Sequence, residues 1–414
     1  MSAGAPHQRK DLAANRCAII DAYLVVLFVV VLAVMMTVPS VLAQDSSPFC
    51  ADKDCAGTRQ LLKDLCDFIV VQKANYPVIF IGGYYMRTLV AGYEIFGDQK
   101  YLHTATVYAD RLVARQMPNG FWRTGYGPVY MADTGSALGL LVALYPHVDG
   151  ARQKEYFNSI KRYVTSIQAD GMIHPWGAFG TGWESVRGDT LQDPIYDQYT
   201  LSSALTGGQI FMWMFHVTGR DEYREIAHHA LRWVLSTMRP DGDIPYILKL
   251  EGFDWTRRND IQMAATLWNK QPYGTSAYVG EGIMAFGLYC GNSSWKRWIQ
   301  QAVKPNIEFL LRSQLADGSW SNSGQKSWDR TRSPGIINYL IWYYEQVDRD
   351  PRIVRAVRRF DEYVLKRENG RQYGLLNDGA ITGPKDINYA FNTVTSLTGR
   401  SLADIVSPGV STRW

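Results

Sequence analysis

Hydrophobic and polar positions alternate between two kinds of segment from residue 59 to residue 397. In one kind, apolar residues recur at a spacing of three and four among charged residues, which predicts an amphipathic helix with one buried face. The other kind is apolar nearly all round and rich in Gly, Ala and Ser, which predicts a helix surrounded by protein. The amphipathic set is 59–74, 99–116, 151–168, 221–238, 294–314 and 351–367, and the apolar set is 78–96, 129–145, 196–217, 276–289, 334–347 and 387–397.

The strict alternation of the two sets predicts six helical hairpins. Because an apolar helix needs protein on every side, we expect the apolar helices to form an inner ring and the amphipathic helices an outer one. The expected fold is all-α, an (α/α)6 toroid in a single domain over residues 59–405, with a linker at 44–58 and a tail at 406–414. Glycines such as Gly208 and Gly282 would let inner helices approach closely, and no strand pattern of comparable length interrupts the series.

Loop lengths indicate which face of this toroid is functional. Connections from an amphipathic helix to the next apolar one are long, and long ordered loops in a compact domain usually carry function. These loops emerge beside the amino-terminal ends of the inner helices and hold most of the loop tryptophans. Several open with Asn-Gly or Asp-Gly, the turn that ends a helix, so this motif identifies a structural repeat. Its glycines are Gly120, Gly171, Gly242 and Gly318.

The amino terminus predicts a targeting segment. Residues 22–43 carry no charged side chain and follow Arg9, Lys10 and Arg16. The run is long enough to span a bilayer as an uncleaved anchor, whereas its small-residue end at Ala43 is typical of a signal peptide cleaved after residue 43. Either interpretation predicts that the rest of the chain lies outside the cytoplasm, secreted or held by a single membrane pass.

Four cysteines follow that segment, an even number that permits disulfides outside the cytosol. We expect Cys50 and Cys55 to close a small loop. Cys66 and Cys290 either pair or are buried free thiols on helices. Asn292 begins an Asn-Ser-Ser sequon between two predicted helices, a glycosylation site if the host modifies it.

Composition narrows the function. A net charge of +4, from 43 basic and 39 acidic residues, is too small to mark a nucleic-acid-binding protein. The chain has 13 Trp and 25 Tyr, a surplus that suggests loops presenting flat apolar faces to a ligand. No His, Cys, Asp and Glu set has a metal-ligand spacing, so we expect no metal and no cofactor.

Three carboxylates are the candidate catalytic groups. Asp133 and Asp197 head the second and third apolar helices, and Glu281 lies one turn inside the fourth. Carbohydrate chemistry on this rim requires a proton donor and a second carboxylate. Each candidate also has a structural interpretation, because an Asp at a helix start is often an N-cap and a buried Glu is often half of an ion pair.

Aromatic and charged residues of the long loops are the candidate substrate contacts. Indole rings pack against the C–H faces of sugars, and a guanidinium can hold a uronate carboxylate through two hydrogen bonds. The candidates are Trp122, Trp176, Trp183, Asp193, Trp255, Arg258 and Trp328.

Residues 59–400 resemble the six-hairpin glycosidase superfamily. Within it, the stretches 116–122, 131–133 and 176–183 look like those of the unsaturated glucuronyl and rhamnogalacturonyl hydrolases. That resemblance implies a catalytic Asp at the start of an inner helix, which is Asp133 here. It also implies an oligosaccharide substrate that contains uronate, and a hydrolase that hydrates an unsaturated terminal uronyl residue.

Three alternatives stay open. A uronyl epimerase or polysaccharide lyase shares the same toroid. A toroidal terpenoid cyclase is the second alternative, because residues 116–122 and 314–320 resemble its Gln/Trp repeats, although the acidic motif of such cyclases is absent. The third is a protein that binds glycans without turning them over.

Overall fold

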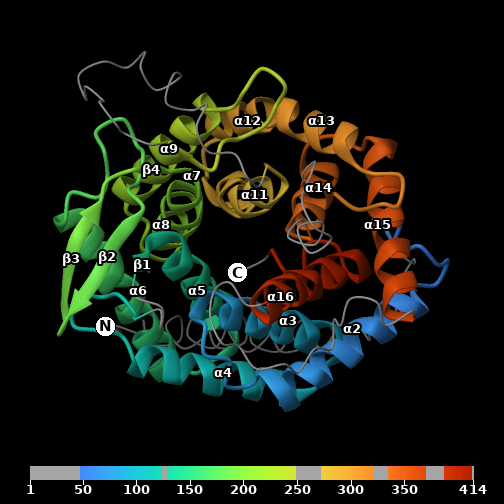
Figure 1. Cartoon of the computed structure of the whole chain (residues 1–414), viewed down its shortest axis with the longest axis horizontal. Helices are drawn as coiled ribbons and strands as arrows, with labels where there is room; N and C mark the ends of the chain where they lie inside the picture. Colours follow the sequence, from blue (N-terminus) through green and yellow to red (C-terminus); the bar gives the residue numbers. More distant parts are fainter. Residues whose placement is uncertain (1–46, 124–127, 249–271, 321–333, 370–386, 413–414) are drawn as a thin grey trace, which may run out of the picture. The chain divides into compact units, whose positions relative to one another are not determined.

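The computed structural model describes residues 47–123, 128–248, 272–320, 334–369 and 387–412, and in them the predicted helices form two concentric rings (Figure 1). The outer ring consists of α2 (Ala56–Phe68) with the π-helical η1 (Ile69–Lys73), α4 (Gln99–Ala114), α6 (Gly150–Ala169), α9 (Asp221–Ser236), α12 (Ser293–Ala302) with α13 (Lys304–Ser313), and α15 (Pro351–Asn369). The inner ring consists of α3 (Ile79–Phe96), α5 (Met131–Leu144), the run α7 (Thr200–Ser202), η3 (Ser203–Ile210) and α8 (Phe211–Thr218), then α11 (Pro272–Tyr289), α14 (Gly335–Gln346) and α16 (Ile387–Val406). The (α/α)6 toroid is confirmed.

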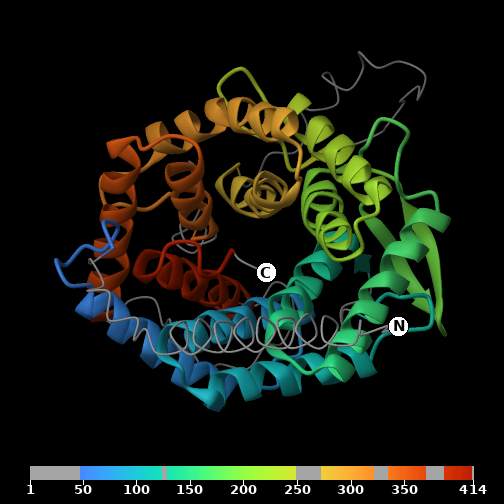
Figure 2. The same cartoon turned by 180° about the vertical axis from the view of Figure 1, so that it is seen from behind.

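The inner ring closes on itself. Its helices contact in the order α3, α5, η3, α11, α14 and α16, and α16 returns to α3, a circle that Figures 1 and 2 show from both sides. In α5, all residues but Asp133 and Ala143 are buried, whereas the outer helix α9 buries only the face that includes Leu231 and Val234. The apolar and amphipathic patterns of the sequence therefore correspond to the two rings.

Close packing of the inner ring depends on glycine where η3 meets α11. A Cβ atom on Gly208 would lie 3.0 Å from the Gly282 Cα atom, and one on Gly282 would overlap the Ala204 carbonyl. These separations are too short for a side chain, so the predicted close approach of the two helices is confirmed at this pair.

Two helices begin or break where the sequence pattern did not predict it. The outer helix expected at 294–314 is interrupted at Val303, because Pro305 has no N–H to donate to a preceding carbonyl and its ring clashes with the preceding turn. The inner helix expected from residue 196 starts at Thr200 instead, because residues 198–199 pair with another loop as strand β4. The last inner helix extends past its predicted end at 397 to Val406.

Short strands connect the long loops. Strands β1 (Val129–Tyr130), β2 (Gly182–Arg187) and β3 (Thr190–Ile195) form an antiparallel sheet in that order, with Trp183 paired to both Val129 and Pro194. Strand β4 (Gln198–Tyr199) pairs with β5 (Ile247–Leu248). The sequence pattern predicted none of these strands, which are shorter than the helices they join.

The Gln/Trp repeat braces neighbouring outer helices. The Gln116 Nε2 atom donates to the Gly120 and Ser159 carbonyls at 2.8 and 2.9 Å, and Gln314 Nε2 donates to Gly318 and Ala356 at 2.9 and 2.8 Å. Each motif thus ties its own turn to the next outer helix. Its contacts are structural, in agreement with the turn chemistry of the sequence.

The first helix is held by a small covalent loop. Cys50 and Cys55 form the expected disulfide, with their Cα atoms 5.3 Å apart, while Cys66 and Cys290 are buried free thiols. The Asp361 carboxylate accepts hydrogen bonds from the Ala51 N–H and the Thr58 hydroxyl, both at 2.7 Å, which fastens this loop to α15.

The predicted targeting segment at 22–43 lies outside the described residues. Within the described ranges, no helix is long and apolar enough to cross a membrane. The described residues from 47 to 412 belong to one compact unit, in which the first described helix begins at Ala56 and the last ends at Val406.

Candidate active site

A small cavity lies inside the inner ring, at the amino-terminal ends of its helices. Its volume is about 80 Å³, enough for a few water molecules and smaller than the 300–1,000 Å³ of typical ligand pockets. Side chains of the inner helices α3, α5, α7, η3, α11 and α16 line it, together with those of β4 and of the loop before β5. They are Phe80, Ala132, Asp133, Ser136, Tyr199, Leu201, Leu205, Tyr246, Tyr278 and Thr393.

Asp133 is the acidic residue of this lining. It is the third residue of α5, where the helix dipole stabilises a negative charge, and its side chain is half-buried. The helix begins here because Tyr130 is extended as part of β1 and the Met131 N–H donates to the Thr181 carbonyl at 3.0 Å. The sheet thus fixes the position at which Asp133 enters the ring.

Tyrosine hydroxyls surround this carboxylate. Burial raises the pKa of Tyr199 well above its usual value, and the charges of Tyr246 and Asp133 add to the effect, so Tyr199 stays a protonated donor. Its hydroxyl donates to the Tyr246 hydroxyl at 2.5 Å. Tyr163, behind α5, has its pKa raised by burial with a smaller contribution from Asp133, and its hydroxyl lies 2.9 Å from Thr206 Oγ1.

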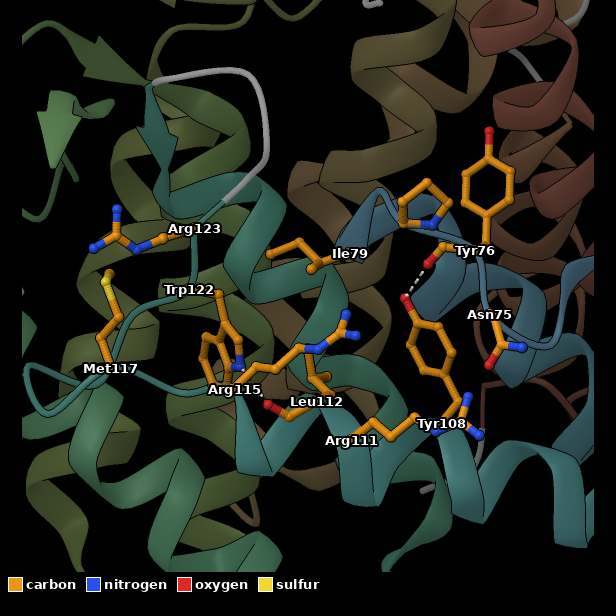
Figure 3. A pocket seen from close by; sticks show the side chains of 11 residues that line it. Asn75, Tyr76, Ile79, Tyr108, Arg111, Leu112, Arg115, Met117, Trp122 and Arg123 are labelled. Atoms are coloured by element: carbon orange, nitrogen blue, oxygen red, sulfur yellow. Dashed lines mark hydrogen bonds between the residues drawn. The ribbon is translucent and has the colours of Figure 1, made fainter. Parts of the chain in front are cut away.

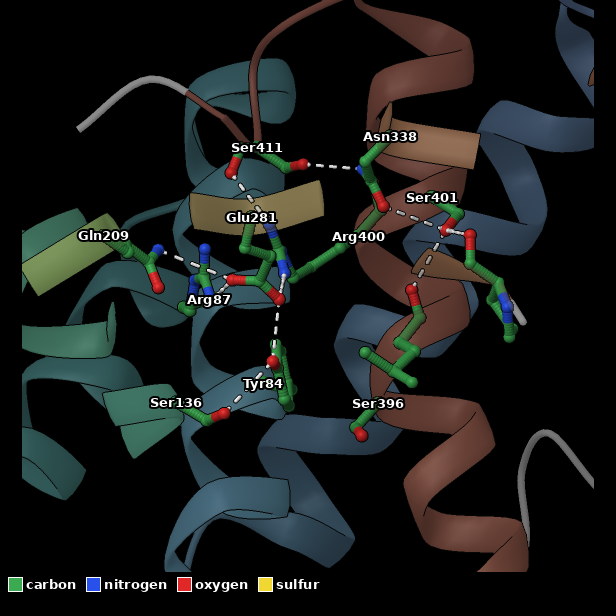
Figure 4. Close-up of polar contacts among 12 residues, drawn as sticks. Tyr84, Arg87, Ser136, Gln209, Glu281, Asn338, Ser396, Arg400, Ser401 and Ser411 are labelled. Carbon is green, nitrogen blue, oxygen red and sulfur yellow. Dashed lines mark hydrogen bonds and ion pairs between the residues drawn. The ribbon is translucent and has the colours of Figure 1, made fainter. Parts of the chain in front are cut away.

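The floor of the cavity leads to a buried ionic cluster. The Ser136 hydroxyl lies 3.2 Å from the Tyr84 hydroxyl, which donates to Glu281 Oε1 at 2.7 Å. Arg87 Nη1 lies 2.7 Å from Glu281 Oε2, and Arg400 Nη1 lies 2.8 Å from Oε1 (Figure 4). Side chains of α3 and α16 therefore bind the Glu281 carboxylate of α11, and Ser136 of α5 is linked to it through Tyr84.

The chemistry of Glu281 follows from these partners. Burial alone would raise its pKa, but Arg400, Arg87 and the Tyr84 hydrogen bond outweigh burial and lower the pKa to about 2. The carboxylate is ionised at neutral pH, and both its oxygens accept hydrogen bonds from buried donors. This arrangement favours the ion-pair interpretation of Glu281 over the role of a proton donor.

The third predicted carboxylate, Asp197, lies elsewhere. It precedes β4 and stands three residues before the helix it was expected to head, and its backbone carbonyl accepts a hydrogen bond from Thr181 Oγ1 at 3.0 Å. Among the described residues, the structure therefore brings Asp133 alone of the three candidates into the lining of the central cavity.

The predicted tryptophans that lie in described loops pack against neighbouring protein residues. Trp122 is 1% exposed and donates its indole N–H to the Leu112 carbonyl at 2.7 Å. Trp183 is buried with its ring edge-on to Phe121, at 4.6 Å between centroids. Trp176 is half-buried and donates to Gln198 Oε1 at 2.9 Å. None of these three tryptophans is among the described residues that line the central cavity.

The remaining predicted contacts divide into one exposed residue and three that cannot be placed. Asp193 is exposed on β3, with a left-handed φ of 54°. Trp255, Arg258 and Trp328 lie outside the described residues. Within the part of the chain that is described, no three His, Cys, Asp or Glu side chains gather as metal ligands would.

Sequence reasoning missed the tyrosines of the cavity. Tyr199, Tyr246 and Tyr278 come from three separate segments, and only the fold brings them together around Asp133. The one signal available was the overall surplus of tyrosine, which does not distinguish one tyrosine from another.

Comparison with solved structures identifies the same architecture. A possible member of glycoside hydrolase family 105 from Salmonella enterica superposes with a TM-score of 0.62 at 13% identity, over 84% of this chain and 94% of that one. The unsaturated glucuronyl hydrolase of Bacillus sp. GL1 gives 0.59 at 15% identity, over 85% and 98%. The cellobiose 2-epimerase of Spirochaeta thermophila gives 0.54 at 12% identity, over 84% and 97%. The chain has the six-hairpin fold of these proteins.

No protein-family model matches the sequence, and no curated protein matches it either.

Proposed function

We propose that the protein is a carbohydrate-active hydrolase that acts on an oligosaccharide containing uronate, with Asp133 as general acid and base. The observation that carries the proposal is the place of Asp133, in the first turn of an inner helix and in the lining of the central cavity. The shared fold with an unsaturated glucuronyl hydrolase supports the same choice.

The proposed reaction is hydration of the double bond in an unsaturated terminal uronyl residue. Asp133 delivers a proton to one carbon of the double bond and accepts a proton from the water molecule that adds to the other, so the carboxyl group ends as it began. Tyr199 and Tyr246 supply hydroxyl groups on the cavity wall that can hydrogen-bond the sugar. The volume of about 80 Å³ would admit the reacting edge of one sugar ring, with the rest of the sugar outside it.

Loss of the ultraviolet absorbance of an unsaturated uronyl disaccharide tests this proposal. We expect turnover by the wild type and a decrease of about 10²–10⁴-fold in Asp133→Asn, the usual contribution of a general acid or base. Asp170→Asn is the matched control, because Asp170 is an exposed residue at the carboxyl end of α6. Equal absorbance loss by wild type and Asp133→Asn would contradict the role of Asp133.

An epimerase or lyase is the second candidate, because a cellobiose 2-epimerase has the same fold. The same experiment separates the three reactions. Hydration removes the absorbance of the double bond, a lyase creates it from a saturated polymer, and an epimerase changes neither. An aliphatic lining would favour the terpenoid cyclase, whereas Asp133 and tyrosine side chains are part of this lining.

A further inference from the structure

A second cavity lies outside the inner ring, between the carboxyl end of α4 and the loop that leads into α3 (Figure 3). Its volume is about 290 Å³, near the lower limit of ligand pockets. Ile79, Leu112, Met117 and Trp122 give it an apolar wall. Since α4 ends and α3 begins here, the cavity lies on the same face of the toroid as the start of α5 and Asp133.

Two arginines project into this cavity. Arg115 reaches from the end of α4 into the space between Trp122 and Tyr108, and Arg111 lies beside Tyr108 (Figure 3). Among the described residues neither forms an ion pair, whereas several arginines in or just before the outer helices do. Those paired arginines are Arg152, Arg220, Arg224, Arg349 and Arg352.

The lining contains no group that neutralises this charge. No Asp or Glu is among its described residues, and the Tyr108 hydroxyl is already used, as it donates to the Tyr76 carbonyl at 3.1 Å. A third guanidinium, that of Arg123, donates to the Gly188 carbonyl of the β2–β3 turn and points away from the other two. The carboxyl end of α4 attracts one cation through its dipole, which leaves most of the positive charge uncompensated.

An apolar wall opposite two unpaired guanidinium groups matches a sugar that carries an anion. A guanidinium binds a carboxylate or a sulfate through parallel hydrogen bonds, and the C–H face of a pyranose packs on apolar side chains. We propose that this cavity binds one acidic monosaccharide unit, its anionic group held by Arg111 and Arg115. That the ligand is a sugar rests on the proposed function. That it carries an anionic group follows from the arginines of the cavity itself.

Methionine-methyl NMR tests the site directly, because Met117 lines the cavity. The Met117 resonance is assigned with Met117→Leu and followed during titration with glucuronate, glucose 6-sulfate, glucose and benzoate. We expect a saturable shift with glucuronate or with glucose 6-sulfate, and no shift with glucose. Comparison of the first two ligands shows whether the site recognises a carboxylate or a sulfate. An equal response to benzoate would overturn the assignment of a sugar.

Charge variants locate the anion. In the double variant Arg111→Gln/Arg115→Gln we expect the Kd of the acidic sugar, measured from the Met117 resonance, to rise at least about tenfold. This is the loss of affinity expected when one or two charge-assisted hydrogen bonds are removed. The control Arg297→Gln/Arg355→Gln removes the same charge from exposed positions of α12 and α15. It should leave the Kd unchanged. A double variant that binds as tightly as the wild type would overturn the proposal.

Turnover separates this site from the central one. The double variant should hydrate the unsaturated disaccharide at the wild-type rate, because Arg111 and Arg115 lie outside the lining of the central cavity. A wild type whose Met117 resonance never shifts overturns the second site, whatever its activity. If the Met117 resonance shifts but the protein has no hydrolase activity, the proposed function is overturned and the second site remains an acidic-sugar site.

Discussion

Arg400 Nη1, on the last inner helix, lies 2.8 Å from Glu281 Oε1 on the fourth, and this buried ion pair joins positions 119 residues apart. Arg87, on the first inner helix, binds the other oxygen of the same carboxylate. Because α16 also packs on α3, the pair lies where the ring closes. The cluster therefore connects the beginning, middle and end of the toroid through one acidic group.

Glu281→Gln should destabilise the protein strongly. The substitution leaves the Arg87 and Arg400 charges buried without a counter-ion, a change that costs about 3–5 kcal/mol. We expect a decrease in Tm of roughly 4–6 °C, measured by circular dichroism. In Glu345→Gln, which breaks the surface pair with Arg349, the change should stay within about 1 kcal/mol. Similar melting curves for the two variants would show that the cluster adds little.

Gly120→Ala should be more destabilising than Gly171→Ala. Both glycines have a left-handed φ, of 83° and 66°, so either substitution costs about 1–2 kcal/mol of backbone strain. A Cβ atom on Gly120 would also lie 2.8 Å from the Tyr163 backbone nitrogen, whereas one on Gly171 meets nothing within 4 Å. We expect a further loss of about 1–3 kcal/mol for Gly120→Ala in urea unfolding. Equal midpoints would mean that the loop can move away from α6.

His228→Phe should weaken the dependence of stability on pH. Burial, with smaller effects of Arg232 and His229, lowers the pKa of His228 to about 4, below the unfolded value near 6.5. Between these values the unfolded chain binds more protons, so the free energy of unfolding rises with pH from about 4 and levels off above about 6.5. The phenylalanine keeps the stacking on Trp295 and removes the proton, which should flatten this part of the curve.

Asp361→Asn should change the same curve in the opposite direction. Burial raises the pKa of Asp361 to about 6, above the unfolded value of 3.8, so the folded chain binds more protons between these values. This group therefore lowers stability as pH rises through that window, and its removal should steepen the rise caused by His228. Unfolding midpoints at several pH values from 4 to 7 measure both effects, and two variants with the wild-type slope would contradict them.

Tyr199→Phe should reduce turnover less than Asp133→Asn does. The change removes the hydroxyl that donates to Tyr246 at 2.5 Å, so the cavity wall loses one of its hydroxyl groups and Tyr246 loses this donor. We expect kcat to fall about tenfold on an unsaturated uronyl disaccharide, roughly the worth of one net hydrogen bond. Tyr223→Phe, a buried position on α9, is the control. Unchanged kcat in Tyr199→Phe would exclude this positioning role.

The hydrophobic pattern predicted the two rings because the helices of each ring bury a different share of their surface. An inner helix such as α5 is apolar on every side, and an outer helix such as α9 on one side, and both patterns are local properties of the sequence. The break at Val303 was not predicted, although its signal, Pro305, is local and can be read in the sequence. The strands were missed because β3 contains Pro194 and the exposed Asp193, which are uncommon in strands.

The candidate site was predicted less completely. Asp133 could be placed at a helix start from its own segment, and the structure places it in the central cavity. Tyr246 and Tyr278 reach the same cavity only through contacts between distant segments, which no local pattern encodes. The partners of Glu281 are equally distant, so the sequence left its two interpretations open and the geometry distinguishes them.

The ionic cluster also determines how a polymer can use the ring. Buried side chains of α3, α11 and α16 meet at Glu281 below the cavity. In the described part of the ring, these side chains close the centre at that level. With Asp133 as the catalytic group, a glycan would reach it from the loop side and not through the ring. In the proposed reaction that glycan presents its unsaturated terminal residue, so each chain would lose one residue and release one monosaccharide.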